Sequence, residues 1–179
     1  MIEGRALIQS LEKAKASVTK LGGQFKSNYI FKDVIFVPKK RNYSWSEDLV
    51  RVRVYVKNDW PTKKVVLVRK KTEWNGRGKK DTIILKKEFD TEKEAFAFIK
   101  KNVSEFEKEF EYSREGWQYE LKKYRIFIEN IEKYRPSIEI EADNESDLQI
   151  LFQKIGAGKI VTESVPEIMR RILKNPPAY

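Results

Sequence analysis

The segment that most constrains the fold is Tyr124–Glu141, with the sequence Y-R-I-F-I-E-N-I-E-K-Y-R-P-S-I-E-I-E. From Ser137 to Glu141, apolar and acidic residues alternate, which is the side-chain period of a β-strand. Residues 125–129 alternate in the same way, and Arg135-Pro136 separates the two runs. The segment therefore predicts two neighbouring strands, each with one charged face and one apolar face.

The charged face of the second predicted strand carries Glu139 and Glu141, one pleat apart. Two carboxylates held that close repel each other, so a neighbouring cation is expected to neutralise them. Oxygen ligands of this kind suit a hard ion such as Mg²⁺ or Mn²⁺. The alternative is an ordinary amphipathic strand whose acidic side chains face water.

The composition is that of a globular protein. The chain has 179 residues, enough for one domain with a real core, and 40% of them are hydrophobic and 12% aromatic. No apolar run is long enough to cross a bilayer, so no membrane association is expected. The first residues show no signal-peptide pattern, and a cytoplasmic location is therefore expected.

Cysteine and histidine are both missing from the sequence. Their absence excludes disulfides, thiol nucleophiles, phosphohistidine chemistry and the triads that depend on histidine. If the protein is an enzyme, carboxylates, lysine, arginine, tyrosine and metal-bound water must carry the chemistry.

The net charge of +10 predicts an anionic partner, such as a phosphorylated metabolite or nucleic acid. Arg51 and Arg53 alternate with valines in the predicted strand 49–56, so they share one face. Paired guanidinium groups can grip phosphate oxygens. The alternative is an exposed edge strand whose charges prevent aggregation.

The remaining pattern predicts short strands and four helices. Further strands are expected at residues 2–8, 25–37, 64–71, 82–89, 106–112 and 117–121, the last two forming a hairpin that turns near Arg114-Glu115-Gly116. Helices are expected at residues 10–21, after a Thr91–Glu94 capping box, at 147–155 with Ser146 as the cap, and at 164–174.

Basic and acidic residues recur on one strand face, while valine, isoleucine and leucine occupy the other. We therefore expect an α+β fold: an antiparallel eight-stranded closed or nearly closed β-barrel, forming a tunnel, with helices packed outside. The whole chain, residues 1–179, would form this single domain. The simpler alternative is a sheet with one solvated face and helices on the other.

Motifs in order along nearly the whole chain resemble the CYTH superfamily. These triphosphate tunnel metalloenzymes include CyaB-type adenylate cyclases and thiamine triphosphatases. The matching segments are 31–36, 49–53, 68–70, 128–141 and 164–167. The family's first strand carries E-x-E-x-K. Here Glu3 keeps the second acid, Arg5 replaces the lysine, and Met1 stands at the first acid position.

The resemblance implies a tunnel that binds a triphosphate together with Mg²⁺ or Mn²⁺. It implies substrate-binding roles for five basic residues, Arg51, Arg53, Lys70, Lys86 and Arg114. It implies metal-binding roles for Glu3, Glu139 and Glu141, and catalytic roles for Glu129 and Arg5.

The expected function is hydrolysis of an inorganic, nucleoside or thiamine triphosphate. One alternative is an adenylate cyclase that converts ATP to cyclic AMP and pyrophosphate. Another is a non-catalytic binder of polyphosphate or RNA, so nucleic acid stays an open partner. A homodimer is also left open.

Overall fold

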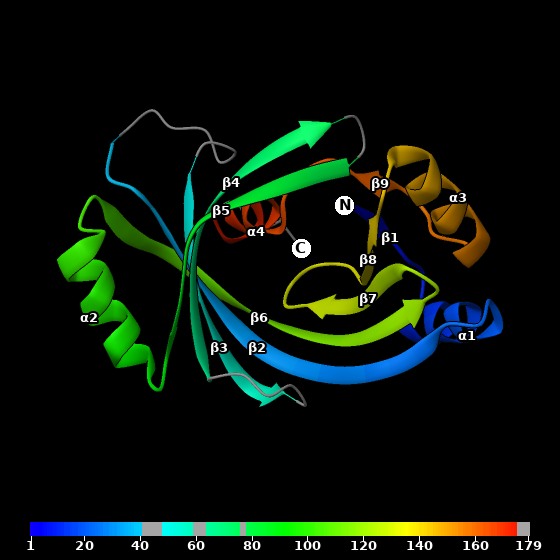
Figure 1. The fold of residues 1–179 in the computed structure, drawn as a ribbon, viewed down its shortest axis with the longest axis horizontal. Helices are drawn as coiled ribbons and strands as arrows, with labels where there is room; N and C mark the ends of the chain where they lie inside the picture. The colour runs from blue at the N-terminus through cyan, green and yellow to red at the C-terminus, as the bar shows by residue number, and fades with distance from the viewer. Residues whose placement is uncertain (41–47, 59–63, 76–77, 175–179) are drawn as a thin grey trace.

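The computed structural model describes residues 1–40, 48–58, 64–75 and 78–174 (Figure 1). The strands in these ranges are β1 (Ile2–Leu7), β2 (Gln24–Pro38), β3 (Leu49–Asn58), β4 (Val65–Asn75), β5 (Gly78–Phe89), β6 (Phe106–Leu121), β7 (Tyr124–Ile131), β8 (Ser137–Ala142) and β9 (Ile160–Val161). The helices are α1 (Leu11–Lys20), α2 (Glu92–Asn102), α3 (Glu145–Ile155) and α4 (Val165–Lys174).

Eight of these strands form a closed antiparallel ring. Their order is β5-β4-β3-β2-β6-β7-β8-β1, and one pairing between Glu3 of β1 and Lys79 of β5 closes the ring. The short strand β9 pairs with β1 outside the ring. The strands of the ring are not arranged evenly around a single axis. The long strands β2 and β6, with 15 and 16 residues, curve along one side of it (Figure 1). The predicted eight-stranded barrel is confirmed.

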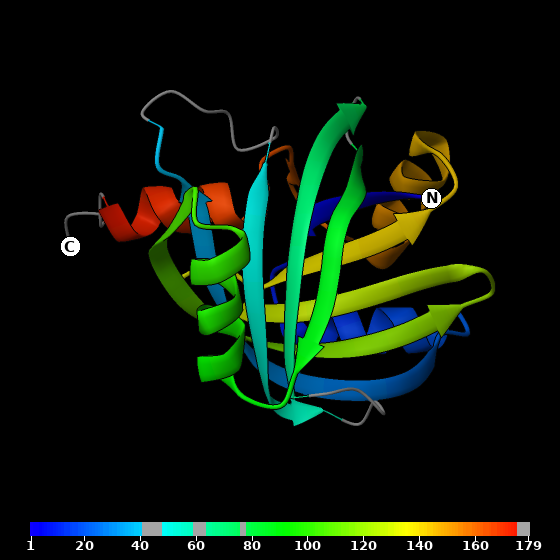
Figure 2. The same ribbon diagram turned by 60° about the vertical axis from the view of Figure 1, so that its left-hand side comes forward.

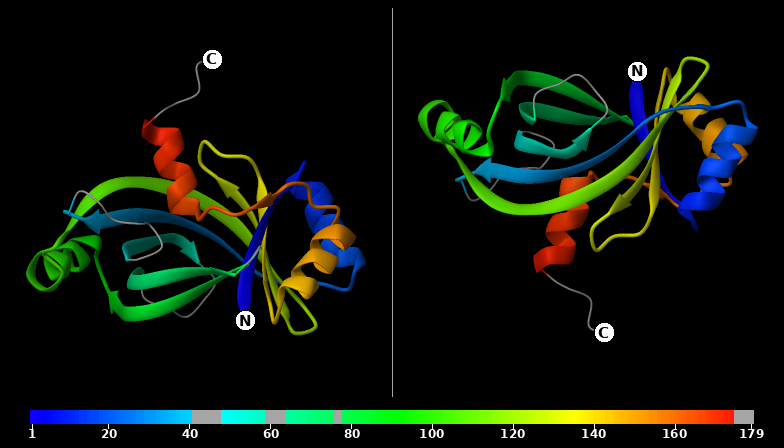
Figure 3. Two further views of the ribbon diagram at one scale, coloured as in Figure 1. Left: turned by 90° about the horizontal axis from the view of Figure 1, so that it is seen from above. Right: turned by 90° about the horizontal axis from the view of Figure 1, so that it is seen from below.

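Three helices cover the outside of the ring. Helices α1 and α3 lie together at one end of the molecule and α2 lies at the other (Figures 1 and 3). Val18 and Leu148 of α1 and α3 pack with Ile140 of β8, and Ile99 of α2 packs with Leu67 of β4. No helix in the described ranges has the length and apolar composition that crossing a bilayer requires.

Helix α4 packs against the inner face of the barrel instead. Its Val165 and Met169 contact a cluster that includes Ile35 of β2 and Leu49 of β3. Ile35 is two residues from Asp33 and shares its strand face, so α4 closes one end of the interior. Figure 2 shows α4 and α2 on opposite sides of β2 and β3.

The predicted caps of the helices are partly confirmed. The capping box between Thr91 and Glu94 is present at α2. At α4, the Glu167 carboxylate accepts a hydrogen bond from the Ser164 backbone N–H at 2.7 Å. The cap of α3 is Asn144, whose side chain accepts from the Asp147 N–H at 2.9 Å, so the assignment of Ser146 was wrong.

Two predicted strand boundaries were also wrong. Strand β5 begins at Gly78, four residues before the predicted start at residue 82. The hairpin near Arg114-Glu115-Gly116 does not exist, because β6 runs without interruption and pairs with β2 along its length. The chain turns after β6 instead, at Lys122, whose φ of 56° is the left-handed conformation of a tight turn.

Gly116 lies inside β6 because the neighbouring strand needs the space of its missing side chain. A Cβ at Gly116 would lie 2.2 Å from Cζ of Tyr29, which occupies the paired position on β2. The tyrosine ring therefore lies directly over the glycine backbone. This glycine marks a close approach of a side chain and not a turn.

We predict that Gly116→Ala destabilises the protein by about 1–3 kcal/mol, because the added methyl group forces the Tyr29 ring out of its position. Urea unfolding measures the effect. Gly158→Ala is the matched control, since the nearest atom to its added Cβ lies 3.4 Å away. Equal stability of the two variants would contradict this packing.

Candidate functional site

The barrel encloses an inner cavity of about 240 Å³. Side chains from all eight strands of the ring and from the start of α4 line it. The charged lining residues are Glu3, Arg51, Arg53, Lys70, Lys79, Asp81, Arg114, Glu129, Glu139 and Glu141. They converge from distant parts of the chain because alternate residues of each strand point inward.

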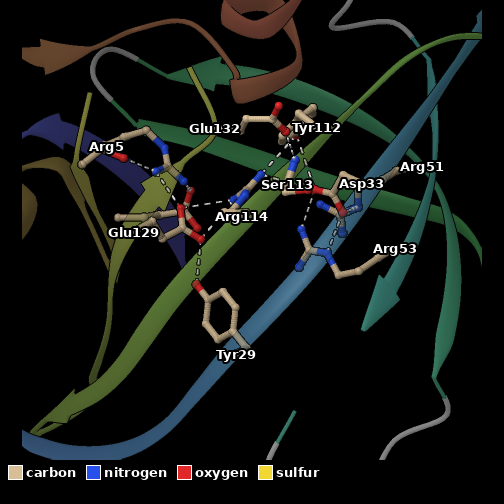
Figure 4. Close-up of polar contacts among 12 residues, drawn as sticks. Arg5, Tyr29, Asp33, Arg51, Arg53, Tyr112, Ser113, Arg114, Glu129 and Glu132 are labelled. Atoms are coloured by element: carbon tan, nitrogen blue, oxygen red, sulfur yellow. Dashed lines mark hydrogen bonds and ion pairs between the residues drawn. The ribbon is translucent and has the colours of Figure 1, made fainter. Parts of the chain in front are cut away.

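Asp33 is the centre of a buried ion network on one side of this cavity (Figure 4). Arg53 grips its carboxylate with two hydrogen bonds, from Nε at 2.8 Å and from Nη2 at 2.9 Å. Arg114 and the hydroxyl of Tyr112 each donate to Asp33 Oδ2 at 3.3 Å. Asp33 thus holds two of the arginines that line the cavity.

Glu129 is the second centre of the network. Its carboxylate lies 2.7 Å from Nη1 of Arg5 and 3.1 Å from Nη1 of Arg114. Tyr29, lying over Gly116, donates its hydroxyl to Glu129 Oε1 at 2.7 Å. Figure 4 shows Arg114 between Glu129 and Asp33, so the two centres form one continuous network.

The network keeps both buried acids ionised. Burial acts to raise the pKa of Asp33, but the charges of Arg53 and Arg51 outweigh it and hold the pKa well below its ordinary value. Burial likewise opposes ionisation of Glu129, and the nearby arginines lower its pKa. These carboxylates act as counter-ions, since removing either one would leave the guanidinium groups around it incompletely neutralised.

Arg51 is only weakly neutralised. Among the described residues, its ion-pair partner Asp33 is 3.9 Å away, and its buried Nε has no hydrogen-bond partner there. Burial, together with the charge of Arg53, lowers the pKa of Arg51. An anion entering the cavity would supply the negative charge and the hydrogen-bond acceptor that Arg51 needs.

The acidic side of the cavity lies on β1 and β8. Glu3 and Glu141 occupy directly opposite positions of these strands, and Glu139 is two residues from Glu141. Like charges in opposite positions destabilise a sheet. Each acid therefore has a cationic partner: Lys79 lies 2.5 Å from Glu3, Arg5 lies 2.5 Å from Glu139, and Arg125 contacts Glu141.

Glu141 is the acid whose charge the fold supports least. Burial, opposed by Arg125 and helped by the charges of Glu3 and Glu139, raises the pKa of Glu141 to about 7. Glu139 behaves in the opposite way. Burial disfavours its charged form too, but Arg5 and Lys79 lower its pKa below the ordinary range.

A lysine pair faces these acids from β4 and β5. Lys70 contacts Asp81, and Thr72 donates to the same carboxylate at 2.6 Å. Burial and the nearby cations Lys79 and Arg51 lower the pKa of Lys70 to about 8. Burial opposes the charge of Lys79 as well, but Glu3 outweighs it and the pKa rises to about 12.

An outer chamber of about 570 Å³ adjoins the inner cavity. The two spaces share part of their walls, through Glu3, Arg51, Arg53, Lys70, Lys79, Asp81 and Glu141. Lys86 and Arg125 line the outer chamber but not the inner cavity. No residue of α4 lines the outer chamber. The outer chamber also contains the apolar side chains Val66, Val68 and Ile83.

The donors that could hold a metal ion are oxygens from the acidic wall. Glu3, Glu139 and Glu141 all face the inner cavity, and carboxylates are the ligands that Mg²⁺ and Mn²⁺ prefer. Within the described ranges, no three acidic side chains lie close enough together to form a ready-made metal site. The donor type fits such an ion, and the three acids would have to leave their cationic partners to bind it.

The structure brings together most of the residues predicted as a site. Eight of them line the inner cavity: Glu3, Arg51, Arg53, Lys70, Arg114, Glu129, Glu139 and Glu141. Arg5 is buried behind this wall and contacts Glu129 and Glu139. Lys86 lines only the outer chamber.

Three charged residues of the site were not predicted from the sequence: Asp33, Lys79 and Asp81. Lys79 and Asp81 alternate just before the predicted strand at 82–89, and a longer strand would have included them. Asp33 is the one acid in the otherwise apolar and basic run F-K-D-V-I-F. A lone carboxylate on a buried strand face is a signal for a buried ion pair.

The sequence matches no protein-family model, and no curated protein sequence matches it. Solved structures do match over nearly the whole chain. A protein of Pyrococcus horikoshii OT3 superposes with a TM-score of 0.73 at 18% identity, covering 93% of this chain and 97% of that one.

Two further structures carry functional names. A proposed adenylate cyclase of Vibrio parahaemolyticus gives a TM-score of 0.68 at 12% identity, covering 94% of this chain and 96% of that one. The other is HpAC1 of Hippeastrum, a proposed adenylyl cyclase described as having a dominant triphosphatase activity. It gives a TM-score of 0.69 at 14% identity, with 94% of each chain covered. This chain shares its fold with these proteins. The fold that the CYTH resemblance implies is thus confirmed.

We predict that Asp33→Asn destabilises the protein by about 3–5 kcal/mol, because it removes the carboxylate that pairs with Arg53 and leaves Glu129 to neutralise the buried Arg114 without it. Guanidinium chloride unfolding measures the change. Asp48→Asn is the control, since Asp48 pairs with Arg69 outside the cavity in a partly exposed position. A loss for Asp33→Asn no larger than that for Asp48→Asn would contradict the role of this network.

We predict that Glu141→Gln raises the melting temperature of the metal-free protein at pH 8 and leaves it nearly unchanged at pH 4. The fold raises the pKa of Glu141 from 4.5 to about 7, so the folded state holds this proton more tightly than the unfolded chain does. Stability is therefore lost as the pH rises from about 4.5 to about 7, and it stays lost above that range.

Glu139→Gln is the matched control two residues away on the same strand. Because the fold lowers the pKa of Glu139, that substitution removes a favourable charge and lowers the melting temperature at pH 8. Destabilisation by Glu141→Gln at pH 8 would show that the carboxylate of Glu141 is well compensated in the fold.

Proposed function

We propose that this protein binds a triphosphate in the inner cavity and hydrolyses it with the help of Mg²⁺ or Mn²⁺. The observation that carries the proposal is the under-neutralised guanidinium of Arg51, which faces the cavity next to Lys70 on the neighbouring strand. A buried cation without a full counter-ion is costly unless an anion binds to it.

The division of charge between two walls supports a chain of phosphates as that anion. Arg51, Arg53 and Lys70 come from β3 and β4, whereas Glu139 and Glu141 come from β8. Strands β3 and β8 are four places apart in the ring of eight and therefore lie across it from each other. Phosphate oxygens would bind the basic wall, and the acidic wall would remain for metal ions.

The balance of charge in the interior supports a role for a metal ion. Among the described residues in or behind the cavity wall, six are acidic: Glu3, Asp33, Asp81, Glu129, Glu139 and Glu141. Six are basic: Arg5, Arg51, Arg53, Lys70, Lys79 and Arg114. The interior is therefore not simply basic, and a triphosphate would bring negative charge that these side chains do not balance.

Glu3, Glu139 and Glu141 would hold the metal ion. Bound there, Mg²⁺ or Mn²⁺ would neutralise phosphate charge and polarise the phosphoryl oxygens. The partners of the three acids, Lys79, Arg5 and Arg125, would become available to phosphate or solvent once the acids bind the ion.

The residues of the chain contribute mainly position and charge to the reaction. Arg51 and Arg53 would hold phosphate oxygens in a fixed place, and Asp33 keeps Arg53 in the orientation needed for this. In hydrolysis, the oxygen of water bonds to the terminal phosphorus, the bridging P–O bond breaks, and the proton that the water loses passes to the leaving phosphate or to solvent. Arg51 and Lys70 would stabilise the negative charge that develops on the leaving diphosphate.

Helix α4 adds to the attraction for an anion. Its first residues, with Ser164 before them, line the inner cavity, so the positive end of the helix dipole faces the same space as Arg51. Glu129 and Arg5, which were predicted to be catalytic, pair with each other and would hold the network that positions Arg114.

A cyclase is the second candidate function, since two proteins with the same fold are named as proposed adenylate or adenylyl cyclases. In that reaction the ribose 3′-hydroxyl attacks the inner phosphorus and pyrophosphate leaves. The description of HpAC1 as mainly a triphosphatase favours hydrolysis as the first candidate. A non-catalytic polyphosphate or RNA binder is the third, because Glu3, Glu139 and Glu141 each pair with a cation and no three acids of the described chain form a ready-made metal site.

We predict that the protein releases phosphate from tripolyphosphate, ATP or thiamine triphosphate only with Mg²⁺ or Mn²⁺, and that EDTA stops the reaction. Arg51→Ala should lower kcat/KM by about 10- to 100-fold, the effect of losing a charged hydrogen bond to phosphate. Arg69→Ala is the control, since Arg69 pairs with Asp48 and Glu105 outside the cavity.

The products separate the three candidates. Phosphate release supports hydrolysis, and release of pyrophosphate with a cyclic nucleotide supports the cyclase. Tight binding without turnover supports the binder. Equal activity of Arg51→Ala and the unchanged protein would refute the placement of the substrate.

A further inference from the structure

The outer chamber differs from the inner cavity in its chemistry. Besides the charged residues that both spaces share, its wall includes the aromatic ring of Tyr55 and the aliphatic side chains of Val66, Val68 and Ile83. These residues come from β3, β4 and β5, three strands that lie side by side (Figure 2). Ile83 is 58% exposed, which is unusual for a large apolar side chain in the wall of a cavity.

Strand register places each of these aliphatic side chains beside a cation of the inner cavity. Val68 is paired with Arg51, Val66 is paired with Arg53, and Ile83 is paired with Lys70. Because paired residues point to the same side of the sheet, each apolar group adjoins a charged one inside the barrel. This wall therefore suits a ligand that is anionic in one part and apolar in the part next to it.

We propose that the outer chamber binds the organic group of a triphosphate ester, and that this group carries an uncharged aromatic ring, as in a nucleoside triphosphate. The inference rests on the proposed binding of a triphosphate in the inner cavity. Inorganic tripolyphosphate would fill only the charged space and would leave Ile83 in water. An ester would also bury the side chain of Ile83, and this burial would add to its binding affinity.

The charge at the chamber favours an uncharged ring. Lys86 and Lys80 line the chamber and are exposed, and Arg53 lies between the chamber and the inner cavity. The chamber wall also contains three acids, Glu3, Asp81 and Glu141, but seven basic residues outnumber them: Arg51, Arg53, Lys70, Lys79, Lys80, Lys86 and Arg125. A cationic organic group is therefore disfavoured, whereas a neutral ring can pack on the aliphatic wall and against Tyr55.

The test compares two adjacent isoleucines by isothermal titration calorimetry in the presence of Mg²⁺. Ile83 lines the chamber, whereas Ile84, which is 48% exposed, lines neither space. Ile83→Ser should weaken ATP binding by about three- to tenfold through the lost apolar contact, and it should leave the affinity for tripolyphosphate unchanged. Ile84→Ser should change neither affinity.

The outcomes separate this inference from the proposed function. If the unchanged protein binds neither ATP nor tripolyphosphate, both proposals fail. If it binds both, and Ile83→Ser weakens both equally or neither, the triphosphate site stands and the chamber assignment is overturned. Thiamine triphosphate, with its cationic ring, should bind more weakly than ATP, and equal or tighter binding would refute the preference for an uncharged ring.

Discussion

The structure depends on one constraint: a closed sheet that turns charged side chains inward must neutralise them there. Eight strands deliver alternate residues to an enclosed space, and an isolated charge buried in such a space is strongly unfavourable. The described interior meets this constraint with a network of ion pairs centred on Asp33 and Glu129. Those two carboxylates fix the positions of the arginines before any ligand arrives.

The charged side chains of the interior are not all neutralised to the same extent, and the incompletely neutralised ones determine what the cavity can bind. Asp33 and Glu129 are held ionised by several partners, whereas Arg51 lacks a close counter-ion and Glu141 has a raised pKa. Asp33 and Glu129 make the network rigid. Arg51 remains incompletely neutralised and can bind an anion, and Glu141 can bind a cation. The proposed site for a metal-bound polyphosphate lies where the ion pairing of the described residues is incomplete.

Much of this arrangement could be predicted from the sequence. Alternation of charged and apolar residues in 49–56 and 137–141 predicted both walls, and the ordered motifs predicted the closed barrel that alternation alone left open. The interruption expected at Gly116 was wrong, because a glycine that makes room for Tyr29 looks the same in the sequence as a glycine in a turn. Asp33 was missed since its partners lie at distant positions, and only the strand register brings them together.

The central claim is that acidic and basic side chains of a shared interior cavity bind a triphosphate. A crystal structure with tripolyphosphate and Mg²⁺ tests this claim most directly. The account predicts phosphate oxygens within hydrogen-bond distance of Arg51 and Lys70, with the metal ion on the side of Glu139 and Glu141. Tripolyphosphate bound only at the outer surface, with the inner ion pairs unchanged, would contradict it.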